Sequence, residues 1–462
     1  MKGYTAILAS AALLAARCVV ATPAQNLVPR ASGTSSGSLP TVTVKGNALF
    51  AGNNRFYIRG IDYQPGGSSD PTDPIANADA CKRDVAEFKK LGLNTIRVYT
   101  VDNTANHDAC MGYLADAGIY LALDVNTPKY SINRANPATS YNDVYLQNVF
   151  ATIDVFAAYS NTLLFFSGNE VINDNTTTKC APYVKATTRD MKQYIGSRGY
   201  RSIPVGYSAA DVDSNRYEMA EYMNCGTADE RSDFYAFNDY SWCDHSTYEQ
   251  SGWNQKVALY GNYSIPLFLS EYGCITNARS FEEVASLYGS SMTPVYSGGL
   301  VYEYSQEGNG YGLVNINGNS VSERPDFTAL QSAFANTKAP SGDGGYSSSN
   351  KPSNCPPHSS TWDVTSDALP AIPGKANTYM SKGAGKGPGL NGPGSQDAGT
   401  ASSGTATPGS GQVTATASSS AGATGSATKG AAAGLRVPEF GFAPFVCGVV
   451  VLVGSVVGAA LL

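Results

Sequence analysis

The feature that most constrains the fold is a repeated alternation of short apolar runs with segments of helical spacing. Each apolar run is typical of a buried parallel strand. Alternation of this kind predicts a parallel sheet, and eight repeats predict an α/β fold closed into a (β/α)8 TIM barrel. The alternative is an open doubly wound sheet, but no Gly-rich phosphate loop follows the first run. The runs lie at residues 56–60, 94–101, 119–125, 163–166, 203–207, 234–237, 267–270 and 299–304.

Acidic residues stand at the ends of most of these runs. Glu170 follows the fourth run in FFSGNEVIND, and Glu271 follows the seventh in PLFLSEYG. A lone glutamate at such a place is more often a solvated loop residue than a catalyst. A barrel, however, collects the carboxyl ends of its strands at one mouth, where catalytic groups lie. The other strand-end carboxylates are Asp62, Asp124, Asp211, Asp239 and Glu303.

Two carboxylates on either side of a bond are what glycoside hydrolysis needs. One is kept protonated and gives its proton to the leaving oxygen, and the other attacks the sugar carbon. The tips of the fourth and seventh strands could hold carboxyl groups about 5 Å apart, the spacing for a retaining enzyme with a covalent intermediate. Arg97, in the second run, could hold a carboxylate charge or form an ion pair in the core.

Tyrosines at strand ends favour a carbohydrate ligand. Aromatic faces pack on sugar rings, and hydroxyls bond to sugar hydroxyls. We expect about half of these tyrosines to serve packing only. They are Tyr63, Tyr99, Tyr240, Tyr272, Tyr302 and Tyr304.

Two other functions compete with this interpretation. Residues 206–210, with Ser208 at the centre, resemble the nucleophile elbow of a serine hydrolase with alanine in place of the last glycine. The histidine of such an enzyme would have to be His245 or His358, and neither lies in a convincing strand-end loop. A non-catalytic barrel that only binds wall polysaccharide is disfavoured, since a binding cleft needs neither Glu170 nor Glu271.

The two ends of the chain predict export and membrane anchoring. Residues 1–21 have Lys2, an apolar core and small residues at the end, which is typical of a secretory signal peptide. Residues 440–462 are apolar and free of charge, and small residues precede them at 425–427 and 430–432. This pattern predicts a glycosylphosphatidylinositol (GPI) attachment propeptide over residues 431–462. The alternative is a membrane-spanning helix, which the length allows.

Between these two ends, the amino-acid composition separates a folded domain from a stalk. Residues 39–369, including an extension through Cys355, form the predicted catalytic domain. Residues 370–430 are rich in Gly, Ser, Thr and Ala and predict a disordered stalk. The formal net charge of −6 argues against a nucleic-acid partner.

Ser140 and Asp143 have the spacing of a capping box and predict the start of the helix before the fourth run.

Cysteine usage fits an exported protein. Of nine cysteines, Cys18 and Cys447 lie in the ends that processing would remove. The remaining seven predict three disulfides and one free thiol, and spacing does not choose among the connectivities. The three histidines are not spaced as a metal pair, so we expect no metal and no other cofactor.

Taken together, seven segments resemble the fungal β-1,3-glucanosyltransferases of glycoside hydrolase family 72. The resemblance covers about residues 42–355, and is greatest to the anchored, glucan-elongating type. The chain lacks the Cys-rich carbohydrate-binding module that follows the barrel in one branch of that family. The segments are FYIRGIDYQPGGSSD, LNTIRVYTVDN, LALDVNTPKYSINR, FFSGNEVIND, IPVGYSAAD, FYAFNDYSWC and PLFLSEYGC.

The resemblance implies roles for particular residues. Glu170 would be the acid/base and Glu271 the nucleophile, with donor-sugar contacts from Tyr99, Asn169 and Tyr302. The rest of the cleft would be lined by Gln64, Asp124, Asn126, Asp211, Arg216 and Tyr240. The implied disulfides are Cys81–Cys110, Cys225–Cys355 and Cys243–Cys274, which leaves Cys180 free.

The resemblance also implies the reaction and the place where it occurs. The enzyme would cut an internal β-1,3-glucan bond and pass the new reducing end to the non-reducing end of another β-1,3-glucan. A hydrolytic endo-β-1,3-glucanase is the alternative. The partners would be the glucan donor, the glucan acceptor and the outer leaflet of the plasma membrane, at the cell surface or in the wall. Asn175 and Asn262 begin N-glycosylation sequons.

Overall fold

The computed structural model describes residues 39–67, 72–406 and 413–414. The predicted signal peptide and the predicted GPI propeptide both lie outside these residues.

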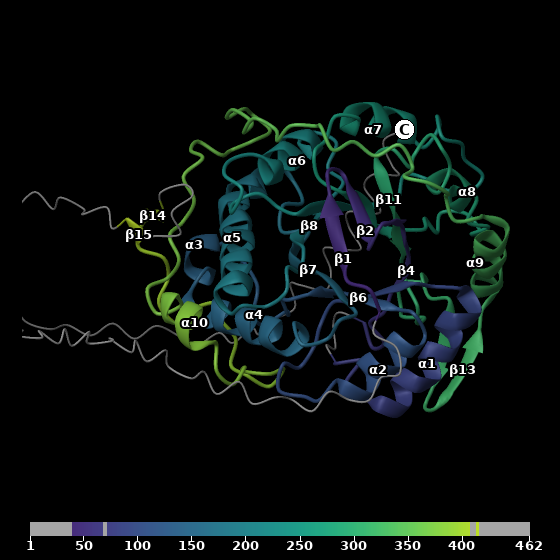
Figure 1. The fold of residues 1–462 in the computed structure, drawn as a ribbon, viewed down its shortest axis with the longest axis horizontal. Helices are drawn as coiled ribbons and strands as arrows, with labels where there is room; N and C mark the ends of the chain where they lie inside the picture. The colour runs from purple at the N-terminus through teal and green to yellow at the C-terminus, as the bar shows by residue number, and fades with distance from the viewer. Residues whose placement is uncertain (1–38, 68–71, 407–412, 415–462) are drawn as a thin grey trace, which may run out of the picture.

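Eight parallel strands form a closed barrel, which confirms the predicted fold class and rules out the open sheet (Figure 1). Seven strands pair with the next strand in chain order, and the eighth pairs with the first. The strands are β4 (Ile58–Asp62), β5 (Thr95–Val98), β6 (Tyr120–Asp124), β7 (Thr162–Asn169), β8 (Val205–Ala210), β9 (Phe234–Asp239), β10 (Leu267–Tyr272) and β11 (Tyr296–Val301).

Helices surround the barrel (Figure 1). In α1 (Ala78–Leu91) the buried face includes Cys81, Val85, Phe88 and Leu91, at the predicted helical spacing. The others are α2 (Asp108–Asp116), α3 (Pro137–Ser140), α4 (Asp143–Phe156), η1 (Asn175–Cys180), α5 (Ala181–Ser197), α6 (Arg216–Asn224), α7 (Trp253–Tyr260), α8 (Glu283–Leu287) and α9 (Pro325–Asn336).

The predicted capping box at Ser140 is wrong. Ser140 ends the short helix α3, and α4 begins after Asn142, whose side chain accepts a hydrogen bond from the Tyr145 backbone N–H. Asparagine is as good a cap as serine. It stands two residues later because the chain turns once between the two helices.

The lower half of the barrel is filled with apolar side chains. Phe166, Phe234 and Phe268 contact one another there, and Gly206 lets two strands approach, since a Cβ atom on it would lie 2.2 Å from the Phe234 carbonyl oxygen. A small sheet of β1 (Val42–Lys45), β2 (Ala48–Ala51) and β3 (Asn54–Phe56) contributes to the same cluster. Polar side chains occupy the other end, toward the carboxyl ends of the strands.

The predicted stalk is wrong for residues 370–406, which we call the C-terminal wrap. The wrap contains α10 (Asn377–Lys382) and β14 (Thr405–Ala406) and lies beside α4 and α5 (Figure 1). Ala371, Ile372 and Ala384 are buried. Apart from β15 (Val413–Thr414), the rest of the predicted stalk lies outside the described residues.

The barrel provides hydrogen-bond partners that the wrap's own side chains do not provide. Barrel side chains hydrogen bond to its backbone: Arg189 donates to the Pro370 carbonyl at 2.9 Å, and Asn142 donates to the Ser395 carbonyl at 2.7 Å. The composition rule considers only a segment's own side chains, so it misses a glycine-rich chain that docks through its backbone.

The three disulfides that the resemblance implies are present: Cys81–Cys110, Cys225–Cys355 and Cys243–Cys274. Cys180 is buried and is the free cysteine of the described part of the chain. A hairpin of β12 (Val314–Asn317) and β13 (Ser320–Glu323), which the sequence did not reveal, precedes α9. Within the described ranges no helix is long and apolar enough to cross a membrane.

Candidate active site

Glu170 is the residue directly after β7, at the mouth of the barrel. Its backbone has φ of 47°, in the left-handed region that non-glycine residues seldom adopt. The backbone N–H donates to the Ser208 carbonyl at 2.9 Å, and one carboxylate oxygen accepts a hydrogen bond from the Asn238 amide at 2.8 Å. The other carboxylate oxygen has no hydrogen-bond partner among the described residues. The sharp turn therefore leaves one oxygen available to a ligand.

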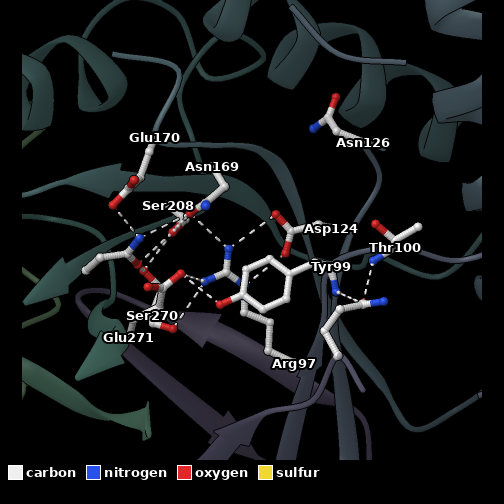
Figure 2. Close-up of polar contacts among 12 residues, drawn as sticks. Arg97, Tyr99, Thr100, Asp124, Asn126, Asn169, Glu170, Ser208, Ser270 and Glu271 are labelled. Carbon is white, nitrogen blue, oxygen red and sulfur yellow. Dashed lines mark hydrogen bonds and ion pairs between the residues drawn. The ribbon is translucent and has the colours of Figure 1, made fainter. Parts of the chain in front are cut away.

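Glu271 lies within β10 and is held at both oxygens. The Tyr99 hydroxyl donates to Oε1 at 2.8 Å, and the Tyr240 hydroxyl donates to Oε2 at 2.7 Å. The Arg97 guanidinium approaches Oε1 at 3.5 Å. Glu271 is 8 % exposed. Figure 2 shows Glu170 and Glu271 near one another beside Arg97, as expected from the ends of two strands of one barrel.

Arg97 contacts several residues of the site. It is fully buried in β5, and its guanidinium donates to both oxygens of Asp124, at 2.9 and 3.2 Å. It also donates to the Asn169 side-chain oxygen at 3.1 Å. The sequence left open whether Arg97 holds a carboxylate charge or forms a core ion pair; it does both, because it pairs with Asp124 and with Glu271.

A layer of short polar side chains lies beneath the two glutamates and was not predicted. The Ser208 hydroxyl donates to the Asn169 side-chain oxygen at 2.7 Å and lies 2.8 Å from the Ser270 hydroxyl. Ser270 in turn donates to the Asn238 side-chain oxygen at 2.8 Å. This accounts for Ser208 without an elbow, since no histidine is among its partners within the described residues. The position of Asn238 at a strand end was the one signal that could have indicated it.

The surroundings distinguish the two carboxyl groups. Burial raises the pKa of Glu271 to about 7; the charge of Glu170 adds to the rise, while Arg97 and the hydroxyls of Tyr240 and Tyr99 oppose it. A proton on Glu271 would displace one of its hydrogen-bond donors, whereas Glu170 has a free oxygen. The geometry therefore favours an ionised Glu271 and leaves Glu170 one oxygen that can take up and give a proton.

Three tyrosines form an aromatic cluster beside Glu271. The ring of Tyr311 lies 5.6 Å from that of Tyr240 and 5.2 Å from that of Tyr302, both edge-on. Tyr240 and Tyr302 were predicted site residues. Tyr311 was not, because it follows the last strand in a loop with no periodic pattern.

The remaining strand-end tyrosines pack behind the barrel wall, as expected for about half of them. Tyr63 and Tyr304 each donate to the buried Asp84 carboxylate at 2.7 Å, and Tyr272 is also buried.

Three predicted cleft residues serve mainly to hold others. Gln64 is 3 % exposed; its side-chain oxygen accepts from the Tyr99 and Thr100 backbone N–H groups, and its amide donates to the Thr72 carbonyl. Asp124 binds Arg97 with both oxygens. Asn126 stands apart from the pair in Figure 2, with its amide bonded to the Ser167 carbonyl and to the Tyr145 hydroxyl.

Asp211 and Arg216 belong to a separate ion network at the mouth. Asp211 accepts from Arg216 at 2.6 Å and from Lys256 at 2.7 Å, and Lys256 also donates to Asp239 at 2.7 Å. The structure does not bring this network into contact with Glu170 or Glu271. Among the described residues, no group of three or more His, Cys, Asp or Glu side chains could hold a metal ion.

Comparison with known proteins assigns the chain to a family. Residues 31–338 match the glucanosyltransferase family of glycoside hydrolases, family 72. The chain is 65 % identical to the 1,3-beta-glucanosyltransferase gel1 of Aspergillus fumigatus over 91 % of this chain and 92 % of that protein. It is 54 % identical to the 1,3-beta-glucanosyltransferase GAS5 of Saccharomyces cerevisiae over 77 % of this chain and 75 % of the relative.

A solved structure agrees with the fold. A mutant of Saccharomyces cerevisiae Gas2p in complex with laminaritetraose and laminaripentaose superposes with a TM-score of 0.68 at 39 % identity, covering 73 % of this chain and 76 % of that one. With the barrel, the pair of glutamates and these relatives in agreement, the chain belongs to the glucanosyltransferases of glycoside hydrolase family 72.

Proposed function

We propose that the chain elongates cell-wall β-1,3-glucan as a retaining 1,3-β-glucanosyltransferase, with Glu170 as acid/base and Glu271 as nucleophile. The observation that carries this assignment is the asymmetry of the pair. Glu271 receives hydrogen bonds at both oxygens, whereas Glu170 keeps one oxygen free. A family 72 enzyme is a transglycosylase of the glycosidase type, so the pair has the chemistry that the family requires.

In the first half of the reaction an internal β-1,3 bond is broken. A Glu271 oxygen forms a bond to the anomeric carbon while the bond from that carbon to the glycosidic oxygen breaks. Glu170 delivers its proton to that oxygen, which leaves as the 3-hydroxyl of the released fragment. The donors on Glu271 keep it ionised before the attack.

In the second half the glycosyl group moves to another chain. The now ionised Glu170 takes the proton from the 3-hydroxyl at the non-reducing end of an acceptor glucan. The acceptor oxygen bonds to the anomeric carbon, and the bond to Glu271 breaks. The Tyr240, Tyr302 and Tyr311 cluster offers aromatic faces for sugar rings. The Asn169 amide nitrogen, with no partner among the described residues, is available to a sugar hydroxyl.

We assign Tyr99 a second role beside the donor-sugar contact that the resemblance implies. Its hydroxyl is engaged with Glu271 and its ring lies over Arg97, 4.2 Å from the guanidinium carbon. We assign it to holding the nucleophile, with Gln64 and Asp124 behind it. The substrate class is supported by the relatives, which are named 1,3-beta-glucanosyltransferases, and by Gas2p bound to laminari-oligosaccharides.

Product analysis tests the proposal. The enzyme is incubated with a reduced laminari-oligosaccharide, and the products are separated by length. Chains longer than the input are expected; shorter products alone would make the chain a hydrolytic endo-β-1,3-glucanase. Glu170→Gln and Glu271→Gln should each abolish both products, and full activity in either variant would overturn the site assignment.

We propose that the enzyme acts at the cell surface on a GPI anchor. Three disulfides fit an oxidising compartment, and the charge-free run at residues 440–462 fits an anchor signal. A phosphatidylinositol-specific phospholipase should release the enzyme from intact cells, and retention on the membrane would favour a spanning helix.

Asn262 is exposed and suits a glycan, while the side-chain oxygen of Asn175 accepts from Ser214 at 2.7 Å. Both glycosylation sites stay predictions, to be tested by mass spectrometry.

A further inference from the structure

Arg134 reaches the backbone of Glu170 from a distant part of the chain. It lies in the loop between β6 and α3. Its guanidinium donates to the Glu170 carbonyl and, at 3.0 Å, to the Val171 carbonyl. With the Glu170 N–H bonded to the Ser208 carbonyl, both sides of the Glu170 backbone are anchored.

These anchors matter because Glu170 has an unfavourable backbone conformation. A left-handed φ on a residue with a side chain is unfavourable and persists only where the surroundings enforce it. Relaxing this turn would redirect the side chain. Arg134 is therefore placed to decide where the Glu170 carboxyl group points.

The loop that carries Arg134 is held in turn by the C-terminal wrap. Lys129 donates from its side chain to the Leu390 and Gly392 carbonyls, at 3.1 and 3.3 Å, and its own carbonyl accepts from the Ser395 N–H. The Gln396 side chain donates to the Ser131 carbonyl at 2.9 Å. Tyr130, which is fully buried, accepts at its hydroxyl from the Gly394 N–H at 3.2 Å.

We propose that Arg134 is a positioning residue for Glu170 and that the C-terminal wrap is the support that fixes its loop. This inference rests on the proposed role of Glu170 as proton donor. It makes a glycine-rich segment, far from the barrel strands in sequence, a working part of the active site.

The chemistry gives a selective signature. A sugar hydroxyl is a poor leaving group, and its departure needs the proton from Glu170. A dinitrophenyl group leaves as an anion without that proton, while Glu271 still forms its bond to the anomeric carbon. A misplaced Glu170 therefore slows glucan cleavage far more than release of dinitrophenolate, whereas general loss of structure slows both equally.

The first experiment compares Arg134→Ala with Arg59→Ala. Arg59 is a matched control because it also donates to two backbone carbonyls, those of Phe334 and Thr337, away from the glutamate pair. Two rates are measured: cleavage of a laminari-oligosaccharide, and the first turnover of its dinitrophenyl β-glycoside. Arg134→Ala should lose about 10²-fold on the first and less than threefold on the second, within the range for general acid catalysis.

Three further results bear on Arg134. Arg134→Lys should recover part of the lost cleavage, because an ammonium group can still reach one carbonyl. Arg59→Ala should keep the ratio of the two rates. Equal losses on both substrates in Arg134→Ala would overturn the inference.

The second experiment tests the wrap with one substitution at two places. A Cβ atom on Gly392 would lie 2.1 Å from the Tyr130 hydroxyl oxygen, whereas one on Gly374 would meet nothing within 4 Å. Gly392→Ala should show the same selective loss, about tenfold, and Gly374→Ala should show none. If Gly392→Ala does not fold, Lys129→Met removes two surface contacts of the wrap instead. A folded variant of either kind with an unchanged rate ratio would exclude the wrap from this role.

Glu170→Gln separates this inference from the proposed function. If it cleaves glucan normally, the proposed function fails. If it shows the selective loss while Arg134→Ala does not, only the role of Arg134 fails.

Discussion

Glu170 and Glu271 are the same residue type at the same mouth of one barrel, yet they are held in opposite ways. Glu271 is fixed through its side chain, by Tyr99, Tyr240 and Arg97. Glu170 is fixed mainly through its backbone, by Ser208 and Arg134, and Asn238 is its side-chain donor.

The difference follows from what each carboxyl group has to do. A nucleophile must stay ionised and aimed at one carbon, so donors at both oxygens help it. An acid/base must gain and lose a proton within one cycle, so donors at both oxygens would hinder it. Holding the backbone fixes its direction without fixing its charge.

The largest effect is expected from Arg97→Ala, which removes the guanidinium group that supports Glu271. It leaves Asp124 buried, with no other charged group of the described residues within hydrogen-bond distance. Breaking a buried ion pair from one side costs about 3–5 kcal/mol. Urea denaturation should show this loss, together with loss of transfer activity. A decrease of less than about 1 kcal/mol in the free energy of unfolding would mean that the ion pairs of Arg97 do not stabilise the site.

A smaller effect is expected from Tyr240→Phe, which removes one donor from Glu271. Hydrogen bonds to charged groups contribute about 1.5–3 kcal/mol, so transfer should fall by about 10- to 100-fold. The same hydroxyl lowers the pKa of Glu271, so without it the pKa rises above about 7. The rate of dinitrophenolate release should then begin to fall at a higher pH on the acidic side. An unchanged profile would show that the hydroxyl does not set the charge of the nucleophile.

The reverse shift is expected from Glu170→Gln. Its negative charge raises the pKa of Glu271, so the neutral amide lowers that pKa below about 7. Glu271 reacts only when ionised, and the acidic fall in dinitrophenolate release therefore moves to lower pH. If the fall stays in place, the charge of Glu170 does not act on the pKa of Glu271.

The smallest effect is expected from Arg216→Ala, in the network that contacts neither glutamate. Arg216 is partly exposed, with 22 % of its side chain accessible, and such ion pairs contribute about 0–1 kcal/mol. Stability and transfer should change little. A marked rise in KM for long glucans, measured with chains of graded length, would instead give Arg216 the cleft contact that the family resemblance implies.

Sequence reasoning found the barrel and the two glutamates because both rest on local patterns. Apolar runs predict the strands, and the order of the strands places Glu170 and Glu271 at the same end of the barrel. The polar layer was not readable, since Ser208 and Ser270 are short residues inside strands and look like ordinary strand residues. Whether the carboxyl groups stand at the spacing for retention stays a prediction from their strands.

The supports of Glu170 were harder to predict than the residue itself. Arg134 precedes it by 36 positions and acts through main-chain carbonyls, which leave no trace in side-chain patterns. The wrap was misread because its composition is that of a linker. Its docking depends on the surface of α4 and α5, and no window of sequence contains both partners.

The wrap has a consequence for the order of events during synthesis. Its bonds join residues far apart in the chain, such as Asn142 with Ser395, separated by 253 positions. All eight barrel strands leave the ribosome before it, and contacts between such distant residues form late. We expect hydrogen exchange during refolding to protect the Ser395 amide after those of the barrel strands. The wrap, which is made after all eight barrel strands, would then complete the support of Glu170, so a nascent barrel would remain a poor catalyst until the wrap has been made.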